Sequence, residues 1–188
     1  TMNPSTEDIL GAIEKIPAKN IYILPNNGNI ILAAEQAKDL TKDKAVHVIP
    51  TKNIPQGIAA MINFVEGFTP EQNEEAMTEA LFEVKSGQVT YAVRDTVIDG
   101  KEIKAGNIMG LSDKTIEVVG TDVVDTTIDL LKKMMDEESE LITIYYGEEG
   151  TKEDAEKIAK AIEKIDDEME VEIQYGGQPI YYYFVSIE

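Results

Sequence analysis

The polar residues best placed to bind another molecule follow directly on a short apolar segment. Ile21–Leu24 has the apolar, β-branched character of a buried strand, and the sequence Pro25-Asn26-Asn27-Gly28-Asn29 comes next. Asparagine and glycine adopt left-handed backbone angles readily, so this segment predicts a tight turn. An amphipathic helix is expected after the turn, with Asn29 as its N-cap. Its apolar face is predicted to contain Ile30, Ala33, Ala34, Ala37 and Leu40.

Three roles are open to the asparagines of this turn, which are Asn26, Asn27 and Asn29. Backbone N–H groups at a helix N-terminus can bind a phosphate or a carboxylate. The turn lacks the lysine of a phosphate-binding loop and the spacing of the Gly-x-Gly-x-x-Gly fingerprint. The alternatives are therefore a structural turn, a contact surface for a partner, and a nucleotide site.

A second polar loop follows the next predicted strand, Ala45–Ile49. Strands and helices alternate here through short loops, which predicts parallel strands joined by right-handed crossovers. Because the carboxyl ends of parallel strands meet at one edge of the sheet, we expect Thr51, Lys52 and Gln56 to lie beside the asparagine turn. The Lys52 ammonium either contacts an anion there or is simply solvated.

Other polar residues have a structural and a functional interpretation. Glu35 and Gln36 lie one turn into the predicted helix, on its solvated side or as part of the site. His47 alternates with valines and is interpreted as a satisfied or half-buried strand histidine rather than a catalytic base. Arg94 is the only arginine, either paired with a carboxylate or used to bind an anion or a partner. Gln178 follows a predicted Gly-Gly turn.

The final aromatic segment predicts a strand over Pro179–Ile187. Aromatic residues on both faces indicate that the strand is either fully buried or covered by a partner. We expect two of the tyrosines 181–183 to be buried and one to remain exposed for contact. Farther back in the chain, Ser86-Gly87 predicts a turn, and Asp99-Gly100 predicts the type I′ turn of a hairpin over Val97–Ile103.

Composition excludes several classes of function. The 188 residues include 36 acidic and 17 basic residues, a net charge of −19, which argues against binding to nucleic acid or to anionic membranes. No run of about 18 apolar residues predicts a membrane-spanning helix, and no signal peptide is expected. Cysteine is absent, so disulfides, thiolate nucleophiles and cysteine zinc sites are excluded. The acidic loops lack metal-site spacing. The expectation is an acidic cytoplasmic protein, whose charge either keeps it soluble or attracts a basic partner.

The order of elements predicts a two-lobed α/β fold. Residues 1–81 are expected to form a lobe with a parallel βαβ sheet. Residues 82–188 are expected to form a mixed α/β lobe with antiparallel hairpins.

Six blocks of this sequence closely resemble the C-terminal region of the bacterial fatty acid kinase A subunit. This family is also described as dihydroxyacetone-kinase-like or YloV-like. The resemblance spans essentially the whole chain. The blocks are Thr1–Ile9, Ile23–Ile30, Ala33–Ala37, Val48–Lys52, Ile54–Ala60 and Tyr175–Pro179.

This resemblance implies a non-catalytic role. In that family the region follows an ATP-binding kinase domain and a central domain, and it engages an acyl-carrying fatty acid kinase B protein. ATP and magnesium are implied for the kinase domain, and no catalytic residue or cofactor is carried over to this chain. A fold-level similarity to the DegV-like family suggests the alternative of a fatty-acid-binding domain. An autonomous hydrolase or kinase is disfavoured, because the sequence contains no nucleophile arrangement, metal cluster or phosphate loop.

Overall fold

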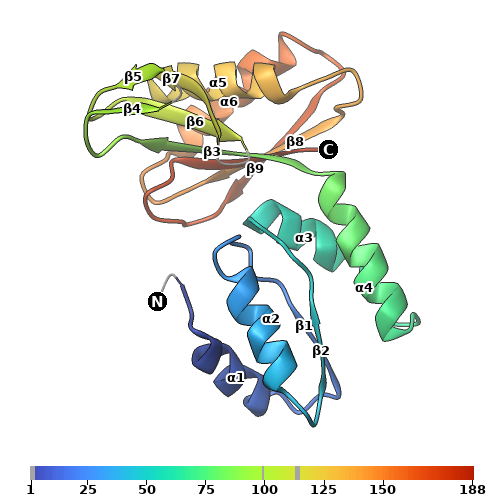
Figure 1. Ribbon diagram of the computed structural model, residues 1–188. Helices are drawn as coiled ribbons and strands as arrows, with labels where there is room; N and C mark the ends of the chain where they lie inside the picture. Colours follow the sequence, from blue (N-terminus) through green and yellow to red (C-terminus); the bar gives the residue numbers. More distant parts are fainter. Residues whose placement is uncertain (1–2, 99, 113–114) are drawn as a thin grey trace. The chain divides into compact units, whose positions relative to one another are not determined.

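A computed structural model describes residues 3–98, 100–112 and 115–188 (Figure 1). The chain folds into two compact units, one ending at Val84 and the other beginning at Lys85. The sequence placed this division after residue 81. The first unit extends three residues farther because Val84 packs against Ala59 and Ala80 in a small apolar cluster.

The first unit consists of a two-stranded sheet between helices. Its elements are α1 (Thr6–Lys15), β1 (Asn20–Ile23), α2 (Ile31–Leu40), β2 (Ala45–Val48), α3 (Ile54–Ile62), α4 (Pro70–Glu79) and a 3₁₀ turn (Ala80–Phe82). The two strands pair in parallel, with Ile21 opposite Val46 and Ile23 opposite Val48. The predicted parallel βαβ arrangement is therefore confirmed.

Alternating side chains of the two strands bury both faces of this small sheet, as the period of a strand requires. Ile21 and Val46 pack against residues of α1 and α2 on one face. Tyr22 and Leu24 on the other face pack against the residues that follow β2 and those of α3 and α4. Figure 1 shows α1 and α2 on one side of the strands and α3 and α4 on the other.

The helix starts follow the sequence at two places and depart from it at a third. The patterns Ser5-x-x-Asp8 and Thr69-x-x-Gln72 predict capping boxes, and capping boxes are present there at the starts of α1 and α4. The prediction that Asn29 caps the next helix is wrong. The N-cap of α2 is Ile30, which provides no side-chain acceptor, because the asparagine turn extends one residue farther. Leu40 was expected on the buried face, yet it lies 60% exposed at the end of the helix.

The second unit contains a six-stranded mixed sheet in the order β7-β6-β3-β10-β8-β9. All neighbours are antiparallel except β8 and β9, which are parallel. Helices α5 and α6 lie side by side on this sheet (Figure 1). The elements are β3 (Lys85–Tyr91), β4 (Thr96–Ile98), β5 (Lys101–Ile103), β6 (Ile108–Ser112), β7 (Thr115–Gly120), α5 (Val123–Met134), β8 (Leu141–Tyr146), α6 (Lys152–Glu163), β9 (Glu170–Tyr175) and β10 (Tyr183–Ile187).

This arrangement confirms the predicted α/β class and the mixed second half of the chain. The predicted hairpin is formed by β4 and β5. Asp99, on which its turn type was predicted, lies outside the described residues.

The turn predicted at Ser86-Gly87 is wrong, because both residues lie inside the continuous strand β3. The glycine serves packing rather than turning. A Cβ atom on Gly87 would lie 2.8 Å from the Met134 sulfur and 3.1 Å from Leu130, and one on Gly110 of the neighbouring strand would also lie 3.1 Å from Leu130. The two glycines therefore let α5 lie close to the sheet.

The last strand is shorter than predicted. It begins at Tyr183, because Ile180 has a φ of 74° that interrupts the extended backbone, and Tyr181 N–H turns back to Pro179 C=O. The predicted burial of two tyrosines is also wrong. Tyr183 is fully buried, whereas Tyr181 and Tyr182 are half-buried at the sheet end.

We predict that Gly87→Ala lowers the free energy of unfolding of the second unit by about 1–3 kcal/mol, because the added methyl group overpacks the contact with α5. Gly11→Ala is the matched control. Gly11 lies within α1 with no atom near its would-be Cβ, so this change is expected to stabilise the first unit by about 0.5–1 kcal/mol. Hydrogen exchange during urea unfolding measures the free energy of unfolding of each unit in its variant. Equal changes in this free energy for the two variants would contradict the packing argument.

Candidate functional site

The two polar loops at the carboxyl ends of β1 and β2 are joined by a hydrogen bond. Asn26 has the left-handed φ of 54° expected for the asparagine turn. Its backbone N–H donates to Thr51 Oγ1 at 2.9 Å. Thr51 is fully buried, so its hydroxyl positions the turn and does not face solvent. The predicted meeting of the two loops at one sheet end is thus present in the structure.

The side chain of Asn26 forms a second contact between the loops. A Cβ atom at Gly57 would lie 2.2 Å from Asn26 Oδ1, so the carboxamide packs directly on the first turn of α3. That oxygen is buried and has no hydrogen-bond partner among the described residues. Glycine at position 57 is therefore required by the close approach of the asparagine.

The second loop is held by its own polar groups. Asn53 caps α3, with its Oδ1 accepting from Gln56 N–H at 3.0 Å. Gln56 Oε1 in turn accepts from Lys52 N–H at 2.8 Å. The backbone N–H and the side-chain oxygen of Gln56 therefore both bond within the second loop and help to fix its backbone. The Lys52 side chain is exposed and forms no ion pair within the described part of the chain.

The accessible part of the first loop lies at the N-terminus of α2. Asn29 is exposed, and its N–H donates to Oδ1 of the half-buried Asn27 at 2.9 Å. Among the residues that the structure describes, no side chain caps α2, so its first N–H groups can donate to an acceptor from outside the loop. The accessible part of the site consists of the N-terminus of α2 with Asn27, Asn29 and Lys52. This accessible part and the three residues behind it, Asn26, Thr51 and Gln56, are together called the paired loops.

Four of the predicted residues lie outside the paired loops. Gln36 Oε1 accepts from the Thr6 hydroxyl at 2.9 Å and thereby ties α2 to the start of α1. Glu35 is half-buried on α2. Arg94 and Gln178 belong to the second unit.

In that unit Gln178 has a structural role. Its Nε2 donates to Tyr145 C=O at 2.8 Å and fixes the loop before β10. Arg94 lies exposed beyond the end of β3, and among the described residues it forms no ion pair. The alternative that pairs Arg94 with a carboxylate therefore has no support in this part of the chain.

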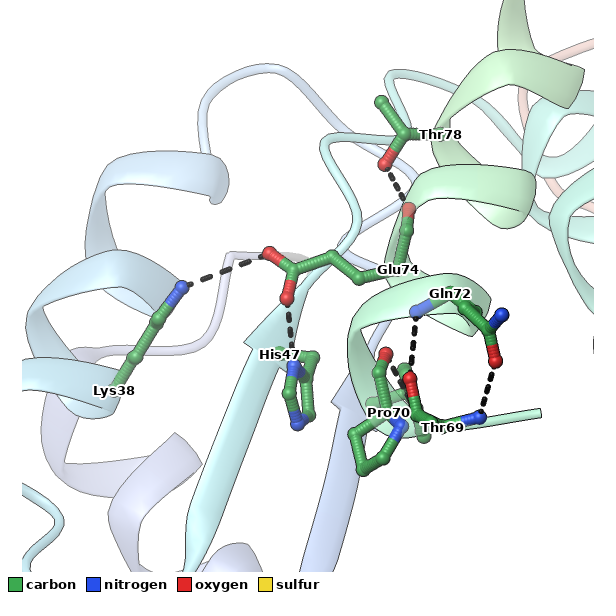
Figure 2. A network of polar contacts seen from close by, with 8 residues as sticks. Lys38, His47, Thr69, Pro70, Gln72, Glu74 and Thr78 are labelled. Carbon is green, nitrogen blue, oxygen red and sulfur yellow. Dashed lines mark hydrogen bonds and ion pairs between the residues drawn. The ribbon is translucent and has the colours of Figure 1, made fainter.

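His47 lies in a polar network inside the first unit (Figure 2). Its Nδ1 lies 2.6 Å from Glu74 Oε2, and Lys38 Nζ lies 3.9 Å from the other oxygen of the same carboxylate. The imidazole stacks on Tyr22 with ring centres 4.9 Å apart. The other ring nitrogen is buried and has no partner among the described residues.

This geometry confirms His47 as a strand histidine, with its Nδ1 satisfied by Glu74. A histidine–carboxylate pair supplies two of the three members of a catalytic triad, yet no nucleophile among the described residues contacts the second ring nitrogen. Glu74 was not singled out from the sequence, because only tertiary packing brings α4 beside β2. Burial also raises the pKa of the Tyr22 hydroxyl, which donates to Pro70 C=O.

Two further findings concern metal binding and membrane insertion. The described residues contain no cluster of three or more histidines, aspartates or glutamates able to hold a metal ion. Among them, too, no helix combines the length and apolar character that crossing a membrane demands.

We predict that Thr51→Val lowers the free energy of unfolding of the first unit by about 1–3 kcal/mol, because the Asn26 N–H loses its buried acceptor. Valine has nearly the same shape as threonine, so the loss measures the hydroxyl. Thr51→Ser keeps the acceptor and is the control. Hydrogen exchange at β1 and β2 in urea reports the change, and equal losses in both variants would argue against the hydrogen bond.

Comparison with solved structures identifies the fold. The fatty acid kinase B3 protein of Streptococcus pneumoniae, solved with linoleic acid, aligns with a TM-score of 0.68 and 16% identity, over 98% of this chain and 76% of that one. The DegV family protein of Corynebacterium glutamicum aligns with a TM-score of 0.67 and 12% identity, over 98% and 81% of the two chains. The dihydroxyacetone kinase of C. freundii aligns with a TM-score of 0.65 and 14% identity, over 98% and 41%. The chain therefore has a DegV-like fold.

Sequence comparison identifies the family. Protein YloV of Bacillus subtilis is 46% identical over 188 residues, and an uncharacterised protein of Staphylococcus aureus strain USA300 is also 46% identical over 188 residues. Both matches cover 100% of this chain and 34% of the relative, so the chain spans about a third of their length. The family model for the C-terminal region of fatty acid kinase A-like subunits matches residues 1–188. The chain belongs to this family of C-terminal domains of fatty acid kinase A-like subunits.

Proposed function

We propose that this chain is a docking domain that binds the acyl-carrying fatty acid kinase B protein, so that a separate domain of the longer protein phosphorylates the fatty acid. The observation that carries the proposal is the geometry of the paired loops. Their backbone is fixed by internal hydrogen bonds, while Asn27, Asn29 and Lys52 remain available to a partner. A surface that is rigid before binding loses little entropy on association.

The chemistry of phosphoryl transfer is assigned to the rest of the longer protein. Phosphoryl transfer needs a phosphate-binding loop or its equivalent and a magnesium site. The described residues offer no such metal cluster, and the paired loops lack the lysine of a phosphate loop. The family resemblance implies ATP and magnesium for the kinase domain. The partner-binding role is proposed for this chain, in the cytoplasm.

The docking proposal predicts that Asn27→Ala combined with Lys52→Glu weakens binding of the acyl-loaded B protein at least tenfold, about 1.4 kcal/mol. The double change removes one partly exposed amide and reverses one exposed charge without touching the Thr51 contact. Titration calorimetry without ATP measures the affinity, and circular dichroism verifies folding.

A matched control carries the same chemical changes elsewhere in the first unit. Asn20→Ala combined with Lys19→Glu alters an exposed amide and an exposed lysine away from the paired loops. We expect this control to bind like the unmodified chain. Normal binding by the folded Asn27 and Lys52 double variant would refute the proposed site.

Fatty acid binding is the second candidate function, and one observation favours it. The N–H groups at the uncapped N-terminus of α2 can donate to a carboxylate. Several solved structures of the same fold contain bound fatty acids. Under the docking proposal, mass spectrometry of the denatured purified chain should detect no co-purifying lipid. One fatty acid per chain, lost in an Asn27→Ala variant, would favour the second candidate instead.

A further inference from the structure

The end of α3 and its connection to α4 expose an unusual amount of apolar surface. Five large apolar side chains within eight residues are between 42% and 75% exposed. They are Met61, Ile62, Phe64, Val65 and Phe68, which we call the apolar platform. Isolated exposed apolar side chains are ordinary, but contiguous groups of them mark interaction surfaces.

The backbone of the platform is held in place by a buried amide. Asn73 of α4 is only 2% exposed. Its Oδ1 accepts from Val65 N–H at 2.8 Å, and its Nδ2 donates to Val65 C=O at 2.9 Å. Phe64 also meets the ring of Tyr22 edge-on, with ring centres 5.5 Å apart. The apolar side chains are thus presented on a fixed backbone, as a preorganised binding surface requires.

Charge around the platform indicates the kind of molecule that covers it. Residues 53–84 contain six glutamates and neither lysine nor arginine. Glu66, Glu71 and Glu75 of this segment are exposed close to the platform in sequence. A second copy of the chain, with a net charge of −19, would be repelled, and so would an anionic membrane. The complementary surface is a protein face with an apolar centre and a rim of lysine or arginine.

The position of the platform connects it with the paired loops. Helix α3 begins at the Asn53 cap beside the paired loops, and its last two residues are Met61 and Ile62. Nine residues of α-helix span about 13 Å. Both surfaces therefore lie within the footprint of one ordinary protein interface, about 800 Å² on each partner.

We propose that the apolar platform is a second contact surface for the acyl-carrying B protein, which covers it with an apolar patch rimmed by basic residues. This inference rests on the proposed docking function and adds to it a surface that supplies most of the binding energy. Buried apolar anchors carry such energy more often than exposed polar contacts do.

The test uses polar substitutions that helices tolerate. Met61→Gln combined with Ile62→Gln removes the two most exposed platform side chains. Surface changes of this kind usually leave the fold intact. Binding of the acyl-loaded B protein, measured by titration calorimetry, is expected to weaken at least tenfold. Phe68→Gln is the second variant, to be used if the first does not fold.

The matched control changes exposed apolar residues in the same unit that lie outside both proposed contact surfaces. Leu40 at the end of α2 and Ile16 after α1 are 60% and 40% exposed. Leu40→Gln combined with Ile16→Gln should leave affinity within about twofold of the unmodified chain, since these residues lie outside the platform and the paired loops. An equal loss in this control would overturn the platform assignment.

The acidic rim is tested through the association rate. Glu71→Lys combined with Glu75→Lys should slow association with the same partner severalfold and make the rate less sensitive to salt, because steering depends on charge complementarity. Unchanged rates would contradict a basic rim on the partner.

The outcomes separate the two proposals. If the unmodified chain binds and the folded platform variants bind equally well, the platform inference is overturned while the docking function stands. If the folded unmodified chain does not bind at all, the docking function fails and the inference falls with it. Sedimentation velocity adds a third outcome that would overturn the inference, since a dimer that the platform variants abolish would show that a second copy covers the surface.

Discussion

The hydrogen bond from Asn26 N–H to the buried Thr51 hydroxyl is the constraint on which the candidate site depends. Parallel pairing brings the ends of β1 and β2 to the same edge, but it does not fix the loops that follow. The hydrogen bond and the contact of the Asn26 carboxamide with Gly57 supply that fixation. The paired loops are therefore part of the folded first unit, and the residues left accessible on them have a defined arrangement.

The polar residues of the site fall into those that fix the loops and those that remain accessible to a partner. Thr51, Gln56 and Asn53 use their polar groups to hold the loops, so they are poor candidates for contact with a partner. Asn29 and Lys52 have the opposite character, because their side chains are exposed. Asn27 combines both roles, since its Oδ1 accepts from Asn29 N–H while its side chain remains half-buried. The same distinction applies to His47, whose imidazole is committed to Glu74 and Tyr22 in the interior.

Local sequence signals predicted the parts of the fold that depend on short-range chemistry. The capping boxes at Ser5 and Thr69, the parallel pairing of the first two strands and the meeting of the two polar loops all followed from spacing and residue type. The family was also recognisable from its sequence blocks. The capping boxes are set by residues three apart, and the pairing follows from the short alternation of strand and helix in the first unit.

The failures occurred where distant packing decides the outcome. Gly87 resembles a turn residue, but it lies in a strand because Leu130 and Met134 need the space above it. The partners of His47 and the burial of Tyr183 likewise depend on elements far away in the sequence. The platform was not predicted, because apolar residues at the end of a predicted helix are usually buried and their exposure is visible only after folding. The roles of the site residues in binding stay predictions.

The contact between Asn26 and Gly57 also restricts how related sequences can vary. The two positions are far apart in the sequence, yet the carboxamide of one occupies the space where the other would carry a side chain. A larger residue at position 57 is tolerable only if position 26 becomes smaller, and glycine suits the left-handed backbone there. Substitutions at these positions should therefore be non-additive, and related chains should exchange the two residues together rather than singly.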